Sequence, residues 1–136
     1  SPFAAVDNLL EKHKGKAKVT FLDFHAEATS EKIAMGWYVD GRMTVVVGTH
    51  IHVPTADPRL LPKGTAFVTD IGMVGPRDSV IGDDPKDVLE RFLTLTPSRL
   101  NVAECPVVQF NSVLIEVDET SGKAKSICRI DREVII

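Results

Sequence analysis

The sequence has few cysteines, no long apolar run and no excess of positive charge, and each of these excludes a class of protein. Cys105 and Cys128 are too few and too far apart for a disulfide framework or a Cys-x-x-Cys metal clamp, so we expect two thiols in a sheet. No apolar run approaches the roughly 20 residues that span a bilayer, and the N-terminus lacks signal-peptide features. We therefore expect a cytoplasmic protein with no membrane partner. A net charge of -3 argues against a passive polyanion-binding surface.

The chain also lacks an initiator methionine, internal repeats and a linker. It opens with Ser1-Pro2-Phe3 and continues directly into an amphipathic segment, so we expect a fragment or a processed product. Its 136 residues carry charges of both signs and 43% hydrophobic residues. These properties predict one globular domain over residues 1–136, and that domain is expected to be partial.

The first half of the chain alternates between helical and strand patterns. Apolar spacing predicts a helix over residues 3–14, and the apolar runs 18–24 and 43–47 predict two strands buried on both faces. Between the strands, Thr29 or Ser30 can cap a helix that ends at residues 40–41. Its expected buried stripe consists of Ile33, Ala34, Trp37 and Tyr38. The alternation predicts a layered α/β fold.

The second half predicts further strands and one helix. We expect a short strand over residues 65–69, a turn at 60–64 and a long glycine-containing loop over 70–82. A helix should begin at Asp83-Asp84-Pro85, with Val88, Leu89 and Phe92 on its apolar face. Residues 107–117 and 124–135 predict two strands joined by a glycine-containing turn at 119–122.

Three of the four histidines follow predicted buried strands. His25 comes after the strand 18–24, and His50 and His52 come after the strand 43–47. On an extended segment, residues i and i+2 point the same way, so the latter two could bind one ion or two adjacent ions. Any single histidine is more simply a hydrogen-bonded core residue, but three together favour a metal site.

Several other residues could support these histidines. Neutral imidazole suits Zn, Fe, Mn or Ni, and Asp23, Glu27 or Asp70 could orient the rings through their second nitrogen. Asp70 is equally compatible with a structural turn. Arg77 is available to meet an anion.

Other kinds of catalytic site find little support. Ser79 and Cys105 lack the surroundings of a nucleophile, and the glycines near residues 72–82 form no phosphate loop because no Gly-Lys-Ser/Thr opens a helix. Asp83 and Asp84 match no calcium loop and are better explained as a helix start.

Three ordered blocks carry a resemblance to a known family. Residues 23–32 (DFHAEATSEK), 48–53 (GTHIHV) and 69–73 (TDIGM) resemble the calcineurin-like metallophosphoesterase superfamily. Together with residues 79–82 (SVIG), they resemble its bacterial 2',3'-cyclic-nucleotide phosphodiesterase branch. The resemblance covers nearly the whole chain but only the C-terminal half of such an enzyme.

The resemblance implies a fold, a metal site and partners. The fold would be the C-terminal half of a four-layer α/β/β/α sandwich, with His25 and His50 on one ion and His52 on a second. The complete site would hold two metal ions, Fe, Mn or Zn, and hydrolyse a phosphoester such as a cyclic nucleotide. The catalytic residues are expected in the missing N-terminal half, so this chain alone should be inactive. That half, another chain or a homo-oligomer would cover its exposed sheet edges.

Two other functions stay open on the sequence alone. One is a noncatalytic metal-binding or oligomerisation domain that uses the same histidines. The other is a plain α/β domain without metal, for which changing His50 and His52 to alanine would alter neither metal content nor stability.

Overall fold

A computed structural model describes all residues, 1–136, as a set of short strands with three helices. The elements in chain order are α1 (Pro2–Lys12), β1 (Phe21–His25), α2 (Thr29–Val39), β2 (Val45–Thr49), β3 (Arg59–Leu60), β4 (Ala66–Val68), β5 (Val74–Pro76), α3 (Pro85–Thr94), β6 (Val107–Phe110), β7 (Val113–Val117), β8 (Ala124–Arg129) and β9 (Arg132–Ile135). The α/β fold expected from the sequence is therefore confirmed.

A four-stranded sheet in the order β1-β2-β4-β3 forms the centre of the molecule. Strands β1, β2 and β4 are parallel, and β3 is antiparallel to β4. Their residues are β-branched or aromatic at most positions, which suits a pleated surface packed on both sides. Parallel pairing brings the C-terminal ends of β1 and β2 to one edge of the sheet, where His25 pairs with Thr49.

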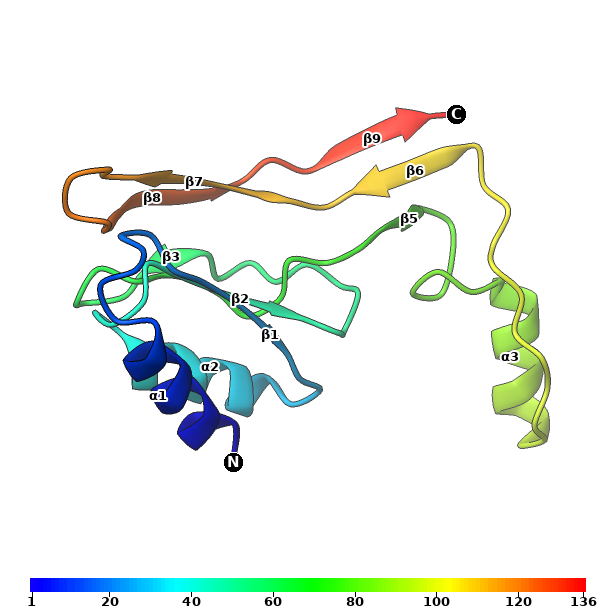
Figure 1. Ribbon diagram of the computed structural model, residues 1–136. Helices are drawn as coiled ribbons and strands as arrows, with labels where there is room; N and C mark the ends of the chain where they lie inside the picture. The colour runs from blue at the N-terminus through cyan, green and yellow to red at the C-terminus, as the bar shows by residue number, and fades with distance from the viewer.

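This sheet lies between a helical layer and a β-hairpin (Figure 1). Helices α1 and α2 lie on one face, and the hairpin β7–β8 lies on the other. Each face has its own apolar core. The helical side buries Val6, Met35, Val39, Val46, Leu61 and Phe67, and the hairpin side buries Val45, Val47, Ala66, Val68 and Ala124.

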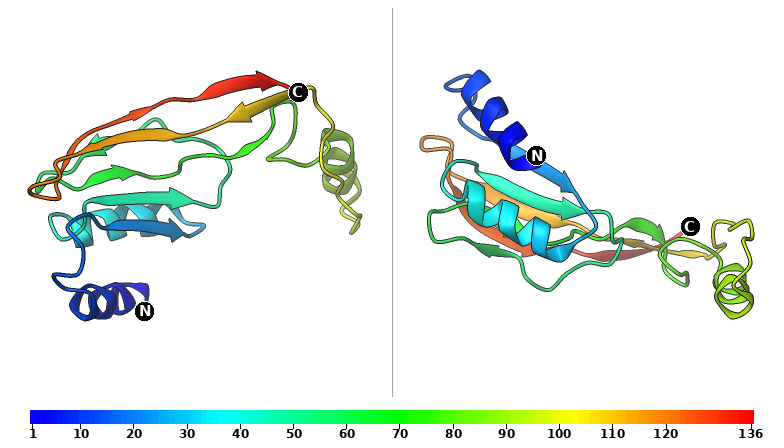
Figure 2. Two further views of the ribbon diagram at one scale, coloured as in Figure 1. Left: turned by 45° about the horizontal axis from the view of Figure 1, so that its top comes forward. Right: turned by 90° about the horizontal axis from the view of Figure 1, so that it is seen from below.

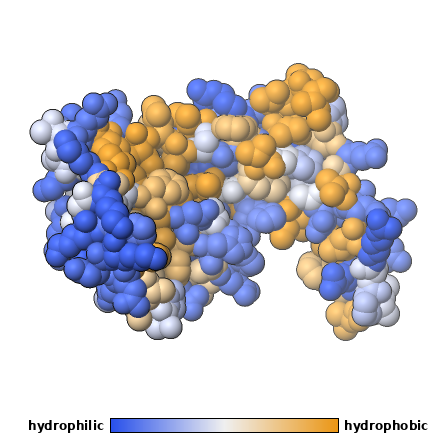
Figure 3. Space-filling view, viewed as in Figure 1, coloured by the Kyte–Doolittle hydropathy of each residue, from blue (hydrophilic) through white to orange (hydrophobic).

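The rest of the chain forms an arm that extends beyond the layered body (Figure 2). The arm consists of the three-stranded sheet β5-β6-β9 and of α3, which lies away from α1 and α2. Figure 3 shows apolar side chains at the surface near the end of this arm. The exposed apolar residues of the arm include Val74, Phe92, Leu93, Leu95, Phe110, Val134 and Ile135.

The predictions of which residues are buried were wrong for one strand and one helix. Strand β1 is not buried on both faces, because it forms an edge of its sheet and leaves Phe21 60% exposed. In α2, the predicted stripe leaves Trp37 51% exposed, and the face that is buried begins instead at Lys32. That face consists of Lys32, Met35, Gly36 and Val39, which have the helical spacing i, i+3, i+4 and i+7.

Several element boundaries also differ from those expected. Residues 107–117 form two strands, β6 and β7, and residues 124–135 form β8 and β9, because each pair of strands joins two different sheets. The turn expected near residue 60 contains β3, and the loop 70–82 contains β5. Helix α3 begins where expected, capped by Asp84, but Leu89 and Phe92 are exposed. The hairpin turn at 119–122 is confirmed.

The two cysteines are free thiols, as expected. Cys128 lies in β8, whereas Cys105 precedes β6 by two residues. None of the helices combines the length and apolarity needed to cross a lipid bilayer.

Candidate metal centre

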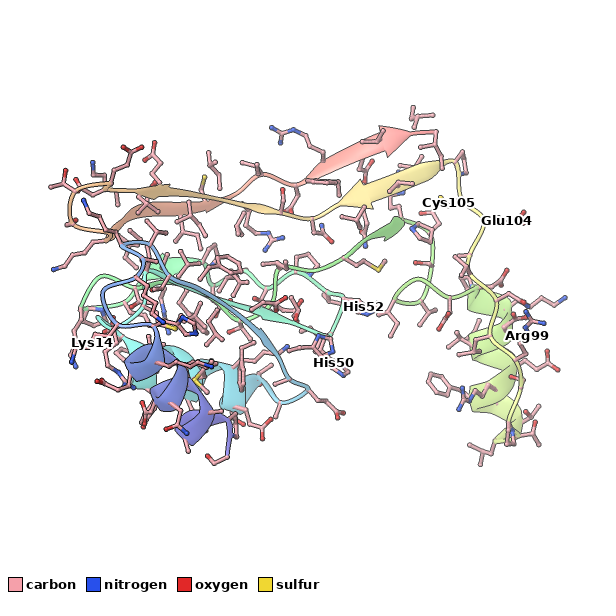
Figure 4. The ribbon with its side chains drawn as sticks, in the orientation of Figure 1. Lys14, His50, His52, Arg99, Glu104 and Cys105 are labelled. Atoms are coloured by element: carbon pink, nitrogen blue, oxygen red, sulfur yellow. The ribbon has the colours of Figure 1, made fainter.

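The three predicted ligands lie at or just after the C-terminal ends of β1 and β2. His25 is the last residue of β1, and His50 directly follows β2. Figure 4 labels His50 and His52 on the connection that leaves β2. The carboxyl ends of parallel strands are the usual place for ligand sites in α/β folds, because the connecting loops converge there.

The rings of His25 and His50 contact each other directly. Nδ1 of His50 lies 3.0 Å from Nε2 of His25. The ring centroids are 4.9 Å apart and the rings are nearly perpendicular, at 87°. Both residues are exposed, so the ring pair lies at the surface of the chain.

A hydroxyl relay fixes the proton on His25. The Thr49 hydroxyl donates to Oδ1 of Asp23 at 2.8 Å and lies 3.0 Å from Nδ1 of His25. Because the hydroxyl proton is directed at the carboxylate, Thr49 accepts from the His25 ring, and Nδ1 carries the hydrogen. Nε2 of His25 then carries a lone pair, which accepts from Nδ1 of His50 here and is the donor that a metal ligand requires.

His52 is oriented by a backbone carbonyl rather than by a carboxylate. Its Nδ1 lies 2.7 Å from the carbonyl oxygen of Ile81, which can only accept a hydrogen bond. Nδ1 therefore carries the hydrogen, and Nε2 is free to bind a ligand. Ser79 closes the turn before Ile81 by donating to the Pro76 carbonyl and accepting from the Gly82 amide.

The backbone around the histidine pair is not extended, which corrects the basis of the sequence prediction. His50 has φ of 111° and His52 has φ of 63°, values that residues with a β-carbon rarely adopt. The i, i+2 rule for strands therefore does not apply here, and the His52 ring turns toward Ile81. The three histidines do not form a single cluster.

The residues expected to assist the histidines occupy different places. Asp23 acts on His25 through Thr49, as described above. Asp70 makes no hydrogen bond to a histidine ring; it accepts from the amide of Ile51, between His50 and His52, at 3.1 Å. Glu27 is exposed and makes no hydrogen bond or ion pair.

Arg77, which was expected to be available for an anion, is paired with two carboxylates at the surface. It pairs with Asp78 at 2.9 Å and with Glu133 at 3.2 Å. The hydrogen bond from the Arg77 side chain lowers the pKa of Asp78, so this pair stays ionised at neutral pH. The charge of Arg77 is therefore balanced by carboxylates of the same arm.

The donor atoms fit part of a metal site. Two imidazole nitrogens, each about 2.1 Å from one ion, lie about 3.0 Å apart when the angle at the metal is about 90° and about 3.4 Å apart when it is tetrahedral. The 3.0 Å between His25 and His50 matches the smaller angle. No group of three histidine, cysteine or acidic residues in the chain is arranged so that it could hold a metal ion. A site with the usual four or more ligands therefore needs donors from outside residues 1–136.

Sequence reasoning missed the hydrogen-bond partners of two histidines and the buried lysine that pairs with Asp70. Thr49 could have been found, because parallel strands place the residue before His50 opposite His25. The Ile81 carbonyl leaves no sequence signal, since any residue could supply it. Lys32 was hidden because a lysine interrupts the apolar pattern that marks a buried helix face.

Known proteins match nearly the whole chain. A family model described as YmdB-like protein matches residues 1–130. The chain is 50% identical over 129 residues to the 2',3'-cyclic-nucleotide 2'-phosphodiesterase of Bacillus subtilis (strain 168), covering 95% of this chain and 48% of that protein.

Two crystal structures share the fold. A hypothetical protein from Thermus thermophilus superposes with a TM-score of 0.90 at 41% identity, over 98% of this chain and 51% of that one. A protein from Mycoplasma pneumoniae, described as a novel phosphatase, superposes with a TM-score of 0.91 at 39% identity, over 98% of this chain and 47% of that one. The chain thus spans about half the length of these relatives.

Proposed function

This chain belongs to the YmdB-like protein family, within the metallophosphoesterase superfamily, and from that premise we propose that it is the histidine-bearing half of a metal-dependent phosphodiesterase. The observation that carries the proposal is the contact between Nε2 of His25 and Nδ1 of His50 at 3.0 Å. Two imidazoles so close together, from segments 25 residues apart, suit a shared cation.

The three histidines have distinct roles in this proposal. His25 and His50 hold one ion, and His52 holds a second through its free Nε2. Fe, Mn or Zn suits these imidazole ligands. Two such ions, when bound, polarise the phosphoester and increase the acidity of the attacking water. Asp23 keeps His25 in the required tautomer through Thr49, whereas Asp70 acts on the backbone between the other two histidines. Glu27 is exposed, two residues after His25 in the sequence, and is the third residue proposed to assist the histidines.

The proposed substrate follows from the Bacillus subtilis relative, which this chain matches over 48% of that protein's length. That protein is named as a 2',3'-cyclic-nucleotide 2'-phosphodiesterase, so we assign a cyclic nucleotide or related phosphoester to the complete site here. Residues 1–136 form one partial domain, and the other half of the site, with its catalytic residues, lies in an N-terminal half or in another chain. This chain alone is then inactive, and the complete protein works in the cytoplasm.

The test compares variants of the complete polypeptide that contains this chain. One variant carries His50→Ala and His52→Ala. The control carries His13→Ala, because His13 is the fourth histidine and follows α1 at its C-terminal end, in a different segment from the site. The two readouts are bound metal per chain and turnover of bis-p-nitrophenyl phosphate.

Each outcome decides between the candidate functions. The proposal expects metal and turnover in the wild type and in His13→Ala, with turnover reduced at least about 100-fold in the double variant. Metal without turnover in every protein would indicate a noncatalytic metal-binding module. Neither metal nor turnover would leave an α/β domain without a metal function.

A further inference from the structure

A completely buried lysine is linked to the segment that carries two of the proposed metal ligands. Lys32 lies on the buried face of α2, and its Nζ is 2.8 Å from Oδ2 of Asp70. The two side chains are 1% and 0% exposed. Removing two charges from water is costly, and a buried ion pair is therefore weak evidence of added stability. The presence of this pair in the core therefore needs an explanation other than added stability.

Asp70 connects this lysine to the histidine segment. The oxygen that pairs with Lys32 also accepts from the Ile51 amide at 3.1 Å. The other carboxylate oxygen accepts from the Gly72 amide at 2.9 Å. The main chain of Asp70 is held in turn by Thr55, whose hydroxyl lies 2.9 Å from the Asp70 amide nitrogen. One carboxylate thus joins α2, the histidine segment and the residues that follow β4.

The neighbouring strand leaves space for the lysine stem. A β-carbon on Gly48 would lie 2.8 Å from Cδ of Lys32 and would overlap the carbonyl oxygen of Thr69. Only glycine therefore lets the aliphatic part of Lys32 pass under β2 to reach Asp70. The glycine of the Gly-x-His-x-His block belongs to the same arrangement as the buried pair.

The segment that Asp70 holds is strained. His50 and His52 both have positive φ, and Ile51 lies between them. Such conformations persist only where surrounding contacts determine them, and they are common at ligand sites. The amide of Ile51 is held in place by the Asp70 carboxylate. Hydrogen bonds to carboxylates are stronger than those to neutral acceptors.

We propose that Lys32 and Asp70 are positioning residues for the metal-binding histidines. Lys32 holds the Asp70 carboxylate in place through the buried ion pair, and that carboxylate fixes Ile51 so that the flanking histidines keep their strained geometry. Without Lys32, a buried carboxylate loses its compensating charge, moves toward water and releases the Ile51 amide. This inference rests on the proposed metal function and extends it to residues that touch no ligand.

The test uses three variants of the complete polypeptide after chelation. Lys32→Met keeps the length of the stem and removes the charge. Lys32→Met with Asp70→Asn removes both charges but leaves an amide oxygen that can accept from Ile51. Val39→Ala is the matched control, because Val39 is buried on the same face of α2 and packs only in the apolar core. The readouts are the Mn²⁺ dissociation constant, hydrogen exchange of the Ile51 amide without metal, and thermal stability.

The expected result separates positioning from stability. Lys32→Met should bind Mn²⁺ about 10- to 100-fold more weakly, the usual range for residues that orient metal ligands. Its Ile51 amide should exchange at least about tenfold faster, while the central strand β2 stays protected. The double variant should recover part of the affinity, and it remains informative if the single variant folds poorly. Val39→Ala should lose stability but keep its Mn²⁺ affinity within about twofold.

Two results would overturn the inference, and they differ. If the wild type binds Mn²⁺ and both Lys32 variants bind it equally well with unchanged Ile51 exchange, the pair is only part of the core. The proposed metal function would survive that result. If the wild type itself binds no metal, the proposed function fails, and the positioning role fails with it.

Discussion

Nε2 of His25 lies 3.0 Å from Nδ1 of His50, although the two residues are 25 positions apart in the sequence. The parallel register of β1 and β2 produces this contact, since His25 pairs with Thr49 and the chain turns immediately afterwards. The site is therefore built by strand pairing and by the turn after β2, and its chemistry depends on a few polar contacts around these two segments.

The hydroxyl of Thr49 is one of these contacts, and its removal should weaken metal binding without disturbing the sheet. Thr49→Val preserves the shape of the side chain but leaves Nδ1 of His25 without an acceptor. We expect the metal dissociation constant of the complete protein to rise about tenfold. The ¹⁵N chemical shifts of the His25 ring should show a loss of the Nδ1-protonated tautomer.

Thr49→Ser serves as the control for this prediction. Serine keeps the hydroxyl between Asp23 and His25, so affinity and ring tautomer should both remain near those of the wild type. Equal affinity in the valine and serine variants would show that the relay has no part in metal binding.

Gly48 should tolerate no side chain. In Gly48→Ala, the new β-carbon would overlap the Thr69 carbonyl and press on the Lys32 stem. The backbone of a central strand cannot move away cheaply, so we expect a loss of about 3 kcal/mol in the free energy of unfolding. Urea denaturation of the complete protein measures this change.

Gly75→Ala is the matched substitution for this prediction. Gly75 lies in β5, and a β-carbon there would meet only the Met73 side chain, whose sulfur lies at an ordinary 3.5 Å. We expect a change within about 0.5 kcal/mol. Equal effects at the two glycines would contradict the close approach seen at Gly48.

The sequence predicted the elements of the site better than their packing. Strand β2 and the histidines after it were located because a short apolar run ending in glycine is a strong local pattern. The face of α2 was misassigned because Lys32 occupies a core position, and hydropathy alone cannot reveal a charge that is neutralised by Asp70, 38 residues away. Long-range pairing of this kind is set by the tertiary structure.

The predictions for β1 and for the backbone of the histidine pair were wrong because both depend on contacts with distant parts of the chain. The run that became β1 has the composition of a buried strand, yet it is an edge strand in residues 1–136. The His50 and His52 geometry was misjudged because positive φ at residues with a β-carbon is imposed by surrounding contacts and leaves no trace in composition. The assignment of all three histidines as ligands remains a prediction.

The turn of the β7–β8 hairpin should make stability depend on pH in the acid range. The backbone amide of Ser121 donates to Asp118 at 2.8 Å, and Lys125 lies 3.0 Å from the same carboxylate. The Ser121 hydrogen bond, aided by Lys125, lowers the pKa of Asp118 from 3.8 to about 2. A depressed pKa means that this stabilisation is complete above 3.8 and is lost as the pH falls toward 2.

Asp118→Asn removes that titration while keeping an oxygen that can accept from the turn amides. We expect its melting temperature to fall less steeply than that of the wild type as the pH is lowered from about 4 to about 2. Glu119→Gln is the control, because Glu119 is the next residue and makes no hydrogen bond or ion pair, so its profile should follow the wild type. If all three melting profiles have the same slope, the Asp118 carboxylate does not stabilise the hairpin turn through its charge.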